Sequence, residues 1–339
     1  MSSFQDSRLG NYFIGISLVC IFFAGLPANI IAFTYFLSRQ SRRPNSKFFK
    51  ITYMIITTID TLILIALVPV IEATFQPYRA GKLFNNNCFC QLWGTLWAIL
   101  PNMSIFMVCV LSVSRYIVLS HSTVRLNKKL SWLIPLMCLA VILLMLLITY
   151  SGKIVTMTYR PQYFLCGPKG FEKPGETDSH KVLLLALINS ILFTSIAGLT
   201  FIPITVSFCL TIHKLRRIRA LSSGIGASTN RQYHASCTVM IVTFIYMIFN
   251  LPFSLAATGF LVKICSLYFS YGEDWQRGYD LFKEEGSPAM NTAAVLFFLV
   301  FIAANSAVNP FIYFSRMNNF RRYVQFVMGD RTAVIMNSL

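Results

Sequence analysis

The chain has 339 residues, of which 55% are hydrophobic and 12% charged, and its formal net charge is +17 at pH 7. A typical soluble domain is about one quarter charged, so this composition excludes an ordinary water-soluble fold. The basic residues are dispersed over several short segments, which argues against a surface that binds nucleic acid.

Seven apolar runs are each long enough to cross a bilayer, for which a helix needs about 20 residues. We therefore predict an all-α membrane protein in which seven transmembrane helices form one bundle. In chain order, the predicted spans are 11–37, 48–71, 90–119, 130–151, 182–213, 234–263 and 290–314. The predicted domains are an extracellular N-terminus at 1–10, the bundle at 11–315, and an amphipathic helix with a short cytoplasmic tail at 316–339.

The charged residues predict the orientation of this bundle. If the N-terminus lies outside, four segments face the cytoplasm, and they hold most of the 29 Lys and Arg residues but only one acid, Asp330. Because cytoplasmic loops carry an excess of Lys and Arg, we expect a multi-pass protein of the plasma membrane with an extracellular N-terminus. The same charge favours contact with anionic lipid of the inner leaflet.

Within the spans, a few polar side chains lie at a depth where lipid offers no hydrogen-bond partner. Asp60 is central in the second span, Ser104 lies in the third, and Asn305, Ser306 and Asn309 lie in the seventh. A charged residue at this depth is costly and indicates function when it can be given partners. A carboxylate surrounded by hydroxyls and amides can hold a small cation. The alternative is a structural polar contact between helices.

Four cysteines, Cys88, Cys90, Cys166 and Cys265, fall on the outer side, where an oxidising environment favours a disulfide. Cys90 opens the third span and Cys166 lies in the long segment after the fourth. We expect this pair to form a disulfide, with Cys88 competing for the same partner. A bridge between Cys88 and Cys265 is a further alternative.

The two longest outer segments have room for local structure. In the first, 152–181, the runs 153–159 and 162–166 flank Arg160-Pro161 and predict two short strands of a hairpin. The second, 264–289, mixes aromatic and acidic side chains. We interpret it either as a solvated cap or as a lid that contacts a ligand.

The seventh span and the segment after it contain two further signals. Pro310 stands in mid-helix, where it lacks an N–H group and leaves a carbonyl that needs another donor. After the span, apolar side chains recur at i, i+3, i+4 and i+7, which predicts a helix lying on the inner membrane surface. These side chains are Phe320, Tyr323, Val324 and Val327.

The order of such residues along the chain resembles that of the rhodopsin-like (class A) G protein-coupled receptors. The matching residues run from the first span to the seventh, each on the helix where hydropathy places it. They are Asn29, Asp60, Cys90, the SRY sequence at Ser114–Tyr116, Trp132, Pro203, Pro252 and the NPFIY sequence at Asn309–Tyr313.

The resemblance implies a receptor that binds an extracellular ligand and activates a heterotrimeric G protein by promoting nucleotide exchange, with arrestin as a further partner. It implies a pocket for Na⁺ and water, and no other cofactor, at Asp60, Ser104, Asn305, Ser306 and Asn309. The residues implied in the switch and in G protein coupling are Arg115, Tyr116, Pro252, Pro310 and Tyr313.

Some positions depart from the family pattern. Ser114 and Gln232 stand where acids would pair with Arg115, so we expect a less stable inactive state and a raised resting activity. Asn250 and Thr211 replace aromatic residues thought to support the active arrangement, which offsets part of that effect.

The ligand is constrained mainly by exclusion. Trp97 stands where amine receptors have an aspartate, and Ala303 where visual pigments have a lysine, which argues against both classes. The implied pocket is apolar with a few hydrogen-bonding groups, as is usual for a small-molecule site. It comprises Trp97, Pro101, Asn102, Ser195, Asn250, Phe253 and Leu299. Both a short peptide and an uncharged, lipid-like or environmental chemical fit this composition.

A membrane transporter or channel is the alternative function. It predicts related halves with interrupted helices, or a path lined by charges, and the sequence shows neither pattern. An enzyme is not expected, because the four histidines are scattered over loops and span ends.

Overall fold

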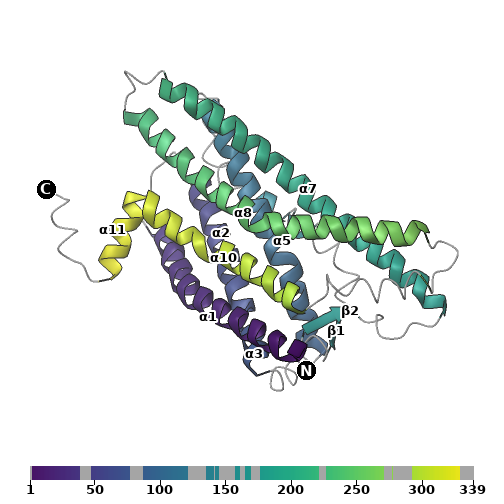
Figure 1. The fold of residues 1–339 in the computed structure, drawn as a ribbon. Coiled ribbons are helices and arrows are strands. Elements are labelled where there is room, and N and C mark those ends of the chain that lie inside the picture. The colour runs from purple at the N-terminus through teal and green to yellow at the C-terminus, as the bar shows by residue number, and fades with distance from the viewer. Residues whose placement is uncertain are drawn as a thin grey trace.

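The structure is a computed structural model in which helices dominate (Figure 1). It describes residues 2–38, 47–76, 87–120, 135–140, 142–144, 157–160, 165–168, 176–220, 227–270, 277 and 292–328. The helices are α1 (Ser2–Leu37), α2 (Lys47–Ala66), α3 (Val68–Phe75), α5 (Asn87–Ser120), α7 (Glu176–Ala220), α8 (Ala227–Ser270), α10 (Thr292–Arg316) and α11 (Asn318–Val327). The strands are β1 (Met157–Arg160) and β2 (Leu165–Pro168).

The predicted spans coincide with these helices. Within the described part of the chain, four stretches are long and apolar enough to cross a membrane, and α7 and α10 cover the predicted fifth and seventh spans. Of the predicted fourth span, the described residues 135–140 and 142–144 are helical. The four stretches are Tyr12–Leu37, Phe48–Phe75, Cys88–Ser120 and Tyr233–Pro252.

Three helices extend beyond the predicted spans. α1 begins at Ser2, inside the segment predicted to precede the bundle, and α8 continues to Ser270, into the predicted second outer loop. α7 begins at Glu176 and ends at Ala220, several residues outside the predicted limits. Hydropathy marks the stretch that needs the hydrocarbon core, whereas a helix continues into water wherever its residues tolerate the helical backbone.

The long helices contact one another in a closed ring. α1 packs on α2, α2 on α5, α5 on α7, α7 on α8, α8 on α10, and α10 on α1. Contacts between α2 and α10 and between α5 and α8 cross the ring. Figure 1 shows α7 and α8 running together along one side of the bundle. The polar residues of several spans therefore meet inside one ring of helices.

The second span is broken near its C-terminal end. α2 ends at Ala66 and α3 begins at Val68, with Pro69 in the first turn of α3. Proline lacks the N–H group that would continue the helical hydrogen bonds. The Nε1–H groups of Trp93 and Trp97 both donate to the carbonyl of Ala66, at 3.0 and 3.2 Å. Two indoles from α5 thus satisfy a carbonyl at the break.

α1 and α10 approach each other closely at Gly25. A Cβ atom at Gly25 would lie 2.5 Å from the Cβ of Ala307 and 3.0 Å from its Cα. Real Cβ atoms do not approach other atoms that closely, so any larger residue here would separate the helices. The backbone of Gly25 therefore packs against the Ala307 methyl group, which leaves no space for a side chain at position 25.

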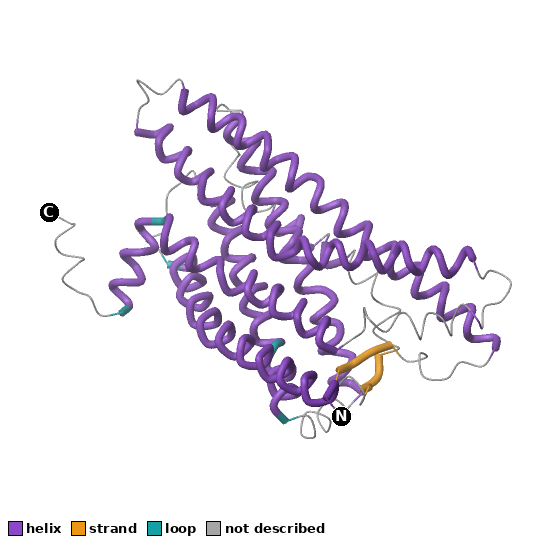
Figure 2. Tube along the Cα trace, viewed as in Figure 1, coloured by secondary structure: helices purple, strands orange, loops and turns teal. Residues whose placement is uncertain are grey.

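The predicted hairpin is confirmed. β1 and β2 pair antiparallel, with Tyr159 opposite Cys166 and Met157 opposite Pro168. The first residues of the predicted runs, 153–156 and 162–164, lie outside the described residues. Figure 2 shows the strands beside the N-terminal end of α1, and both contact α5.

α11 follows α10 directly and turns away from the bundle (Figure 1). Arg321 joins the two helices, because its Nη2 donates to the carbonyl of Ser315 at 2.9 Å and its Nε to that of Phe314 at 3.3 Å. Of the predicted apolar stripe, Phe320 is buried, whereas Val327 is 50% exposed. The exposed end of α11 also carries Phe326 and Met328.

Candidate functional site

Asp60 is fully buried at the centre of the ring, and side chains from two other helices contact it. The Ser104 hydroxyl of α5 donates to Asp60 Oδ1 at 3.1 Å. The Asn309 amide of α10 donates to Asp60 Oδ2 at 2.8 Å. Each carboxylate oxygen therefore accepts a hydrogen bond from a different helix, and the three residues connect α2, α5 and α10.

Oxygen atoms without donors lie around this cluster. Ser306 is fully buried and faces the Asp60 carboxylate, but its Oγ makes no hydrogen bond of good geometry among the described residues. The same holds for Oδ1 of the buried Asn29. Asn305, which precedes Ser306 in α10, is also buried. Buried polar atoms normally have partners, and a water molecule or a cation would supply one to these oxygens. Oxygen ligands with one carboxylate suit a hard cation.

The carbonyl that Pro310 leaves free is that of Ser306, four residues earlier in α10. The Asn29 amide of α1 donates to this carbonyl at 3.0 Å, and to the carbonyl of Gly25 at the same distance. A side chain from the first span therefore satisfies the break in the seventh. This contact explains how α10 carries a proline at that depth.

Arg115 lies at the far end of α5 from Cys90 and contacts aromatic side chains of α2. Its guanidinium carbon lies 3.4 Å from the centroid of the Phe49 ring. The Tyr53 hydroxyl lies beside the guanidinium, without a hydrogen bond of good geometry. Within the described residues no carboxylate pairs with Arg115, and the Ser114 hydroxyl donates to the Val110 carbonyl of its own helix. Tyr116, the next residue in α5, is half-buried.

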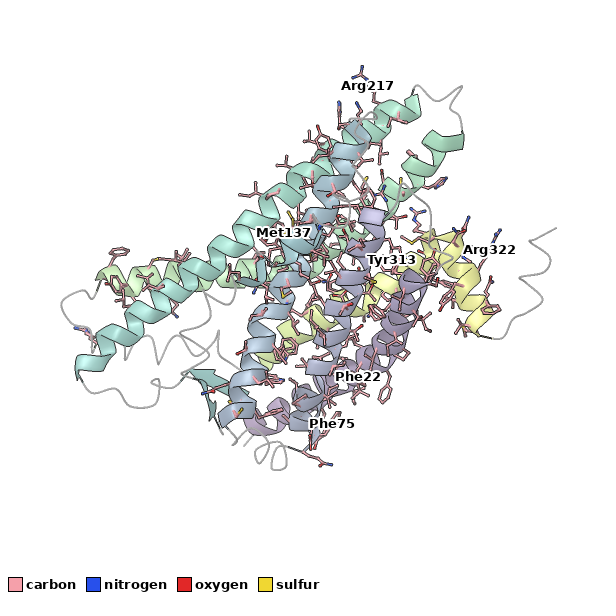
Figure 3. The ribbon with its side chains drawn as sticks, turned by 180° about the vertical axis from the view of Figure 1, so that it is seen from behind. Phe22, Phe75, Met137, Arg217, Tyr313 and Arg322 are labelled. Carbon is pink, nitrogen blue, oxygen red and sulfur yellow. The ribbon has the colours of Figure 1, made fainter. Side chains whose placement is uncertain are left out.

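Tyr313 is fully buried and lies inside the bundle near α11 (Figure 3). Its ring meets those of Phe36 and Tyr53 edge-on at 5.5 and 5.1 Å, and that of Phe320 at 6.4 Å. We call Phe36, Tyr53, Tyr313 and Phe320 the aromatic cluster. It joins α1, α2, α10 and α11, so Tyr313 cannot move without disturbing all four helices.

The structure brings some of the predicted ligand-pocket residues together. Leu299 is buried in an apolar cluster with Trp93, against which Trp97 packs. The Trp97 N–H is already bonded to Ala66, and the Asn250 amide donates to the Tyr246 carbonyl at 2.9 Å.

The remaining predicted pocket and switch residues occupy separate places along the helices. Asn102 is buried, Pro101 is half-buried inside α5, and Pro252 is half-buried inside α8. The side chains of Ser195 and Phe253 lie outside the described part of the structure.

Cys90 takes part in a disulfide. The side chain of Cys166 lies outside the described part, although its strand β2 contacts the helix that carries Cys90. Cys88 and Cys265 both carry thiols, so no bridge joins them. The pairing of Cys90 with Cys166 therefore remains a prediction.

Sequence reasoning missed Phe49, Tyr53 and Trp93, which contact the predicted residues Arg115, Tyr313 and Trp97. A signal was available for two of them. Phe49, Tyr53 and Asp60 are spaced by four and seven residues, which places them on one face of α2. In an apolar chain that contains 30 Phe and 15 Tyr residues, however, this spacing alone does not single them out.

Comparison with known proteins agrees with this arrangement. A search of curated proteins found no match to the chain. The family described as 7 transmembrane receptor (rhodopsin family) matches residues 28–313, from the residue before Asn29 to Tyr313. The match includes Asp60 and Arg115 and covers most of the chain. The protein is therefore a multi-pass membrane receptor that belongs to the rhodopsin family of seven-transmembrane receptors.

Proposed function

We propose that this receptor binds an extracellular ligand and activates a heterotrimeric G protein by promoting nucleotide exchange. The observation that carries the proposal is the contact of Asp60 with Ser104 and Asn309, because one buried charge connects three helices. A ligand that moves any of the three would disturb the other two. Arrestin is a further proposed partner on the same cytoplasmic face.

The proposed orientation places Arg115 and α11 in the cytoplasm and the β-hairpin outside the cell. Figure 3 shows Arg217 at the opposite end of the bundle from Phe75, as this orientation requires. Arg321 and Arg322 lie on the exposed side of α11. The exposed apolar side chains at the end of α11 would enter the headgroup region while these arginines meet anionic lipid.

The proposed ligand is a short peptide or an uncharged, lipid-like or environmental chemical. The Trp97 N–H and the Asn250 amide donate within the protein, so the ring face of Trp97 and the aliphatic side chain of Leu299 would contribute apolar contact. Such a lining favours shape and apolar contact over charge recognition.

The proposed ion site holds Na⁺ at Asp60, with Ser104, Asn305, Ser306 and Asn309 as its surroundings. The orphaned oxygens of Ser306 and Asn29 support a cation here. A sodium ion that binds the resting arrangement preferentially would increase its population by mass action.

The test is a ligand screen on the full chain in membranes, read by guanine-nucleotide exchange on purified G proteins. Peptide and lipid-like libraries are screened separately. A ligand that raises exchange is expected. A transporter or channel would instead produce uptake or ion flux in vesicles without any exchange.

Peptide mapping under non-reducing conditions tests the proposed outer disulfide. A cross-linked peptide that contains Cys90 and Cys166 is expected. Cys90 joined to any other cysteine would show that the pairing is wrong.

A further inference from the structure

The aromatic contact of Arg115 carries an inference about how the resting state is held. We propose that Phe49 and Tyr53 are positioning residues that hold the Arg115 guanidinium against α2, in place of the acids that this chain lacks. This inference rests on the proposed coupling to a G protein. It assigns a restraint to residues that the family resemblance does not single out.

The geometry favours an attraction between the guanidinium and the Phe49 ring. A cation over an aromatic face interacts favourably within about 6 Å of the centroid, and the separation here is 3.4 Å. The interaction strengthens when both groups are out of water. Phe49 is 6% exposed and Tyr53 is 3% exposed, and Arg115 is half-buried, so the contact is partly shielded from water.

Neighbouring rings hold the two aromatic side chains in place. Phe48 meets Phe49 edge-on at 5.2 Å, and Phe36 stacks on Tyr53 at 5.5 Å with an interplanar angle of 10°. These contacts hold both rings in place independently of the guanidinium. A partner whose side chain is already fixed loses less entropy when the contact forms.

The restraint leaves Arg115 poised to change partners. Its Nε is buried and makes no hydrogen bond among the described residues. A ring face attracts the charge without satisfying the N–H donors, whereas a carboxylate would do both. A backbone carbonyl of a docked G protein would therefore offer Arg115 hydrogen bonds that α2 does not provide.

Tyr53 also contacts the seventh span, α10. Tyr53 contacts the Tyr313 ring at 5.1 Å as well as lying beside Arg115. Movement of Tyr313 would remove one wall of the Tyr53 site and loosen the guanidinium. Two residues of the switch thus share one support on α2.

The first experiment measures ligand-free nucleotide exchange at matched surface expression. Phe49→Leu keeps an apolar side chain but removes the ring, and we expect basal exchange to rise roughly fivefold. Phe49→Tyr keeps a ring face and is expected to stay within twofold of the native rate. Progressively fluorinated phenylalanines at position 49 weaken the negative ring face at nearly constant shape, so the basal rate should rise with each fluorine. A flat fluorine series would overturn the proposal.

The second experiment tests the contact without a G protein. Thermal unfolding of the purified receptor is compared for Phe49→Leu, Arg115→Met and the double variant. If the two side chains interact, Phe49→Leu lowers the melting temperature less in the Arg115→Met background. Equal shifts in both backgrounds would show that the contact does not exist in solution.

Together the two experiments separate the inference from the proposed function. A non-additive thermal cycle without nucleotide exchange in any variant, ligand-bound or not, would retain the contact and reject G protein coupling. Exchange by the native chain with unchanged exchange in Phe49→Leu would reject the restraint alone. Gln232→Glu serves as the comparison, and we expect it to change basal exchange less than Phe49→Leu does.

Discussion

The bundle holds two charged groups of opposite sign by different means, the fully buried Asp60 and the half-buried Arg115. Both oxygens of Asp60 accept hydrogen bonds from side chains of other helices. Arg115 lies against the face of Phe49 and beside Tyr53. Hydrogen bonds fix direction and distance, whereas an aromatic face attracts a charge over a wide area. The carboxylate is therefore fixed in position, and the guanidinium is free to leave when a better partner arrives.

The largest expected effect comes from removing the main donor to Asp60. Asn309→Leu deletes the shorter of the two hydrogen bonds and leaves a buried carboxylate oxygen unpaired, which should cost about 1.5–3 kcal/mol of stability. Thermal unfolding of the purified receptor in detergent measures this loss of stability.

The matched control is Asn250→Leu. Asn250 is equally buried, but its amide donates only to a carbonyl of its own helix. If both variants lose the same stability, the charge on Asp60 plays no special part.

The response to sodium is a second way to distinguish the Asp60 site from the Arg115 site. We expect NaCl, but not choline chloride, to raise the melting temperature of the native receptor. Asp60→Asn keeps the shape and removes the charge, so it should abolish this response. At ten times the dissociation constant, the lost stabilisation would be about 1.4 kcal/mol. The same Na⁺ response in Phe49→Leu as in the native chain would show that the two sites are independent.

A smaller effect is expected at the longer of the two hydrogen bonds. Ser104→Ala removes a donor at 3.1 Å and should cost about 1 kcal/mol, measured by thermal unfolding. Ser207→Ala is the control, because Ser207 pairs with Ser112 at 2.7 Å between buried neutral hydroxyls. A larger loss in the control would mean that burial, and not the carboxylate, determines the cost.

The smallest effect is expected at the Tyr53 hydroxyl. Tyr53→Phe keeps the rings that contact Phe36 and Tyr313, and removes a hydroxyl that makes no good hydrogen bond. We expect the free energy of unfolding to change by no more than about 0.5 kcal/mol, because the substitution removes neither a packing contact nor a hydrogen bond. A loss of several kcal/mol would show that the hydroxyl binds Arg115 directly and that the two charges are held alike.

The two charged sites also differ in how far the sequence could predict them. Acidic residues are scarce in the spans, so Asp60 stands out, and the structure places it in hydrogen-bond contact with Ser104 and Asn309. Their role in holding a cation stays a prediction. The surroundings of Arg115 could not be predicted, because aromatic residues are common everywhere in this chain and the partner of any one depends on packing.

The sequence also predicted some features of the fold and not others. Apolar length predicted the spans, and the resemblance to the rhodopsin-like receptors is confirmed by the family match. The helices α1, α7 and α8 extend beyond the predicted spans, because polar residues outside the hydrocarbon core can continue a helix. The expectation that the missing acids leave Arg115 unsupported overlooked the aromatic face that it contacts.

The close approach of α1 and α10 at Gly25 bears on the route by which a ligand could enter. A lipid-like ligand dissolved in the bilayer could reach the interior by passing sideways between two helices. At the level of Gly25 this seam is shut, because the atoms of Ala307 occupy the space where a side chain would be. Lateral entry at this depth must therefore use another pair of helices, and a bulky residue at position 25 would open a gap toward the acyl chains.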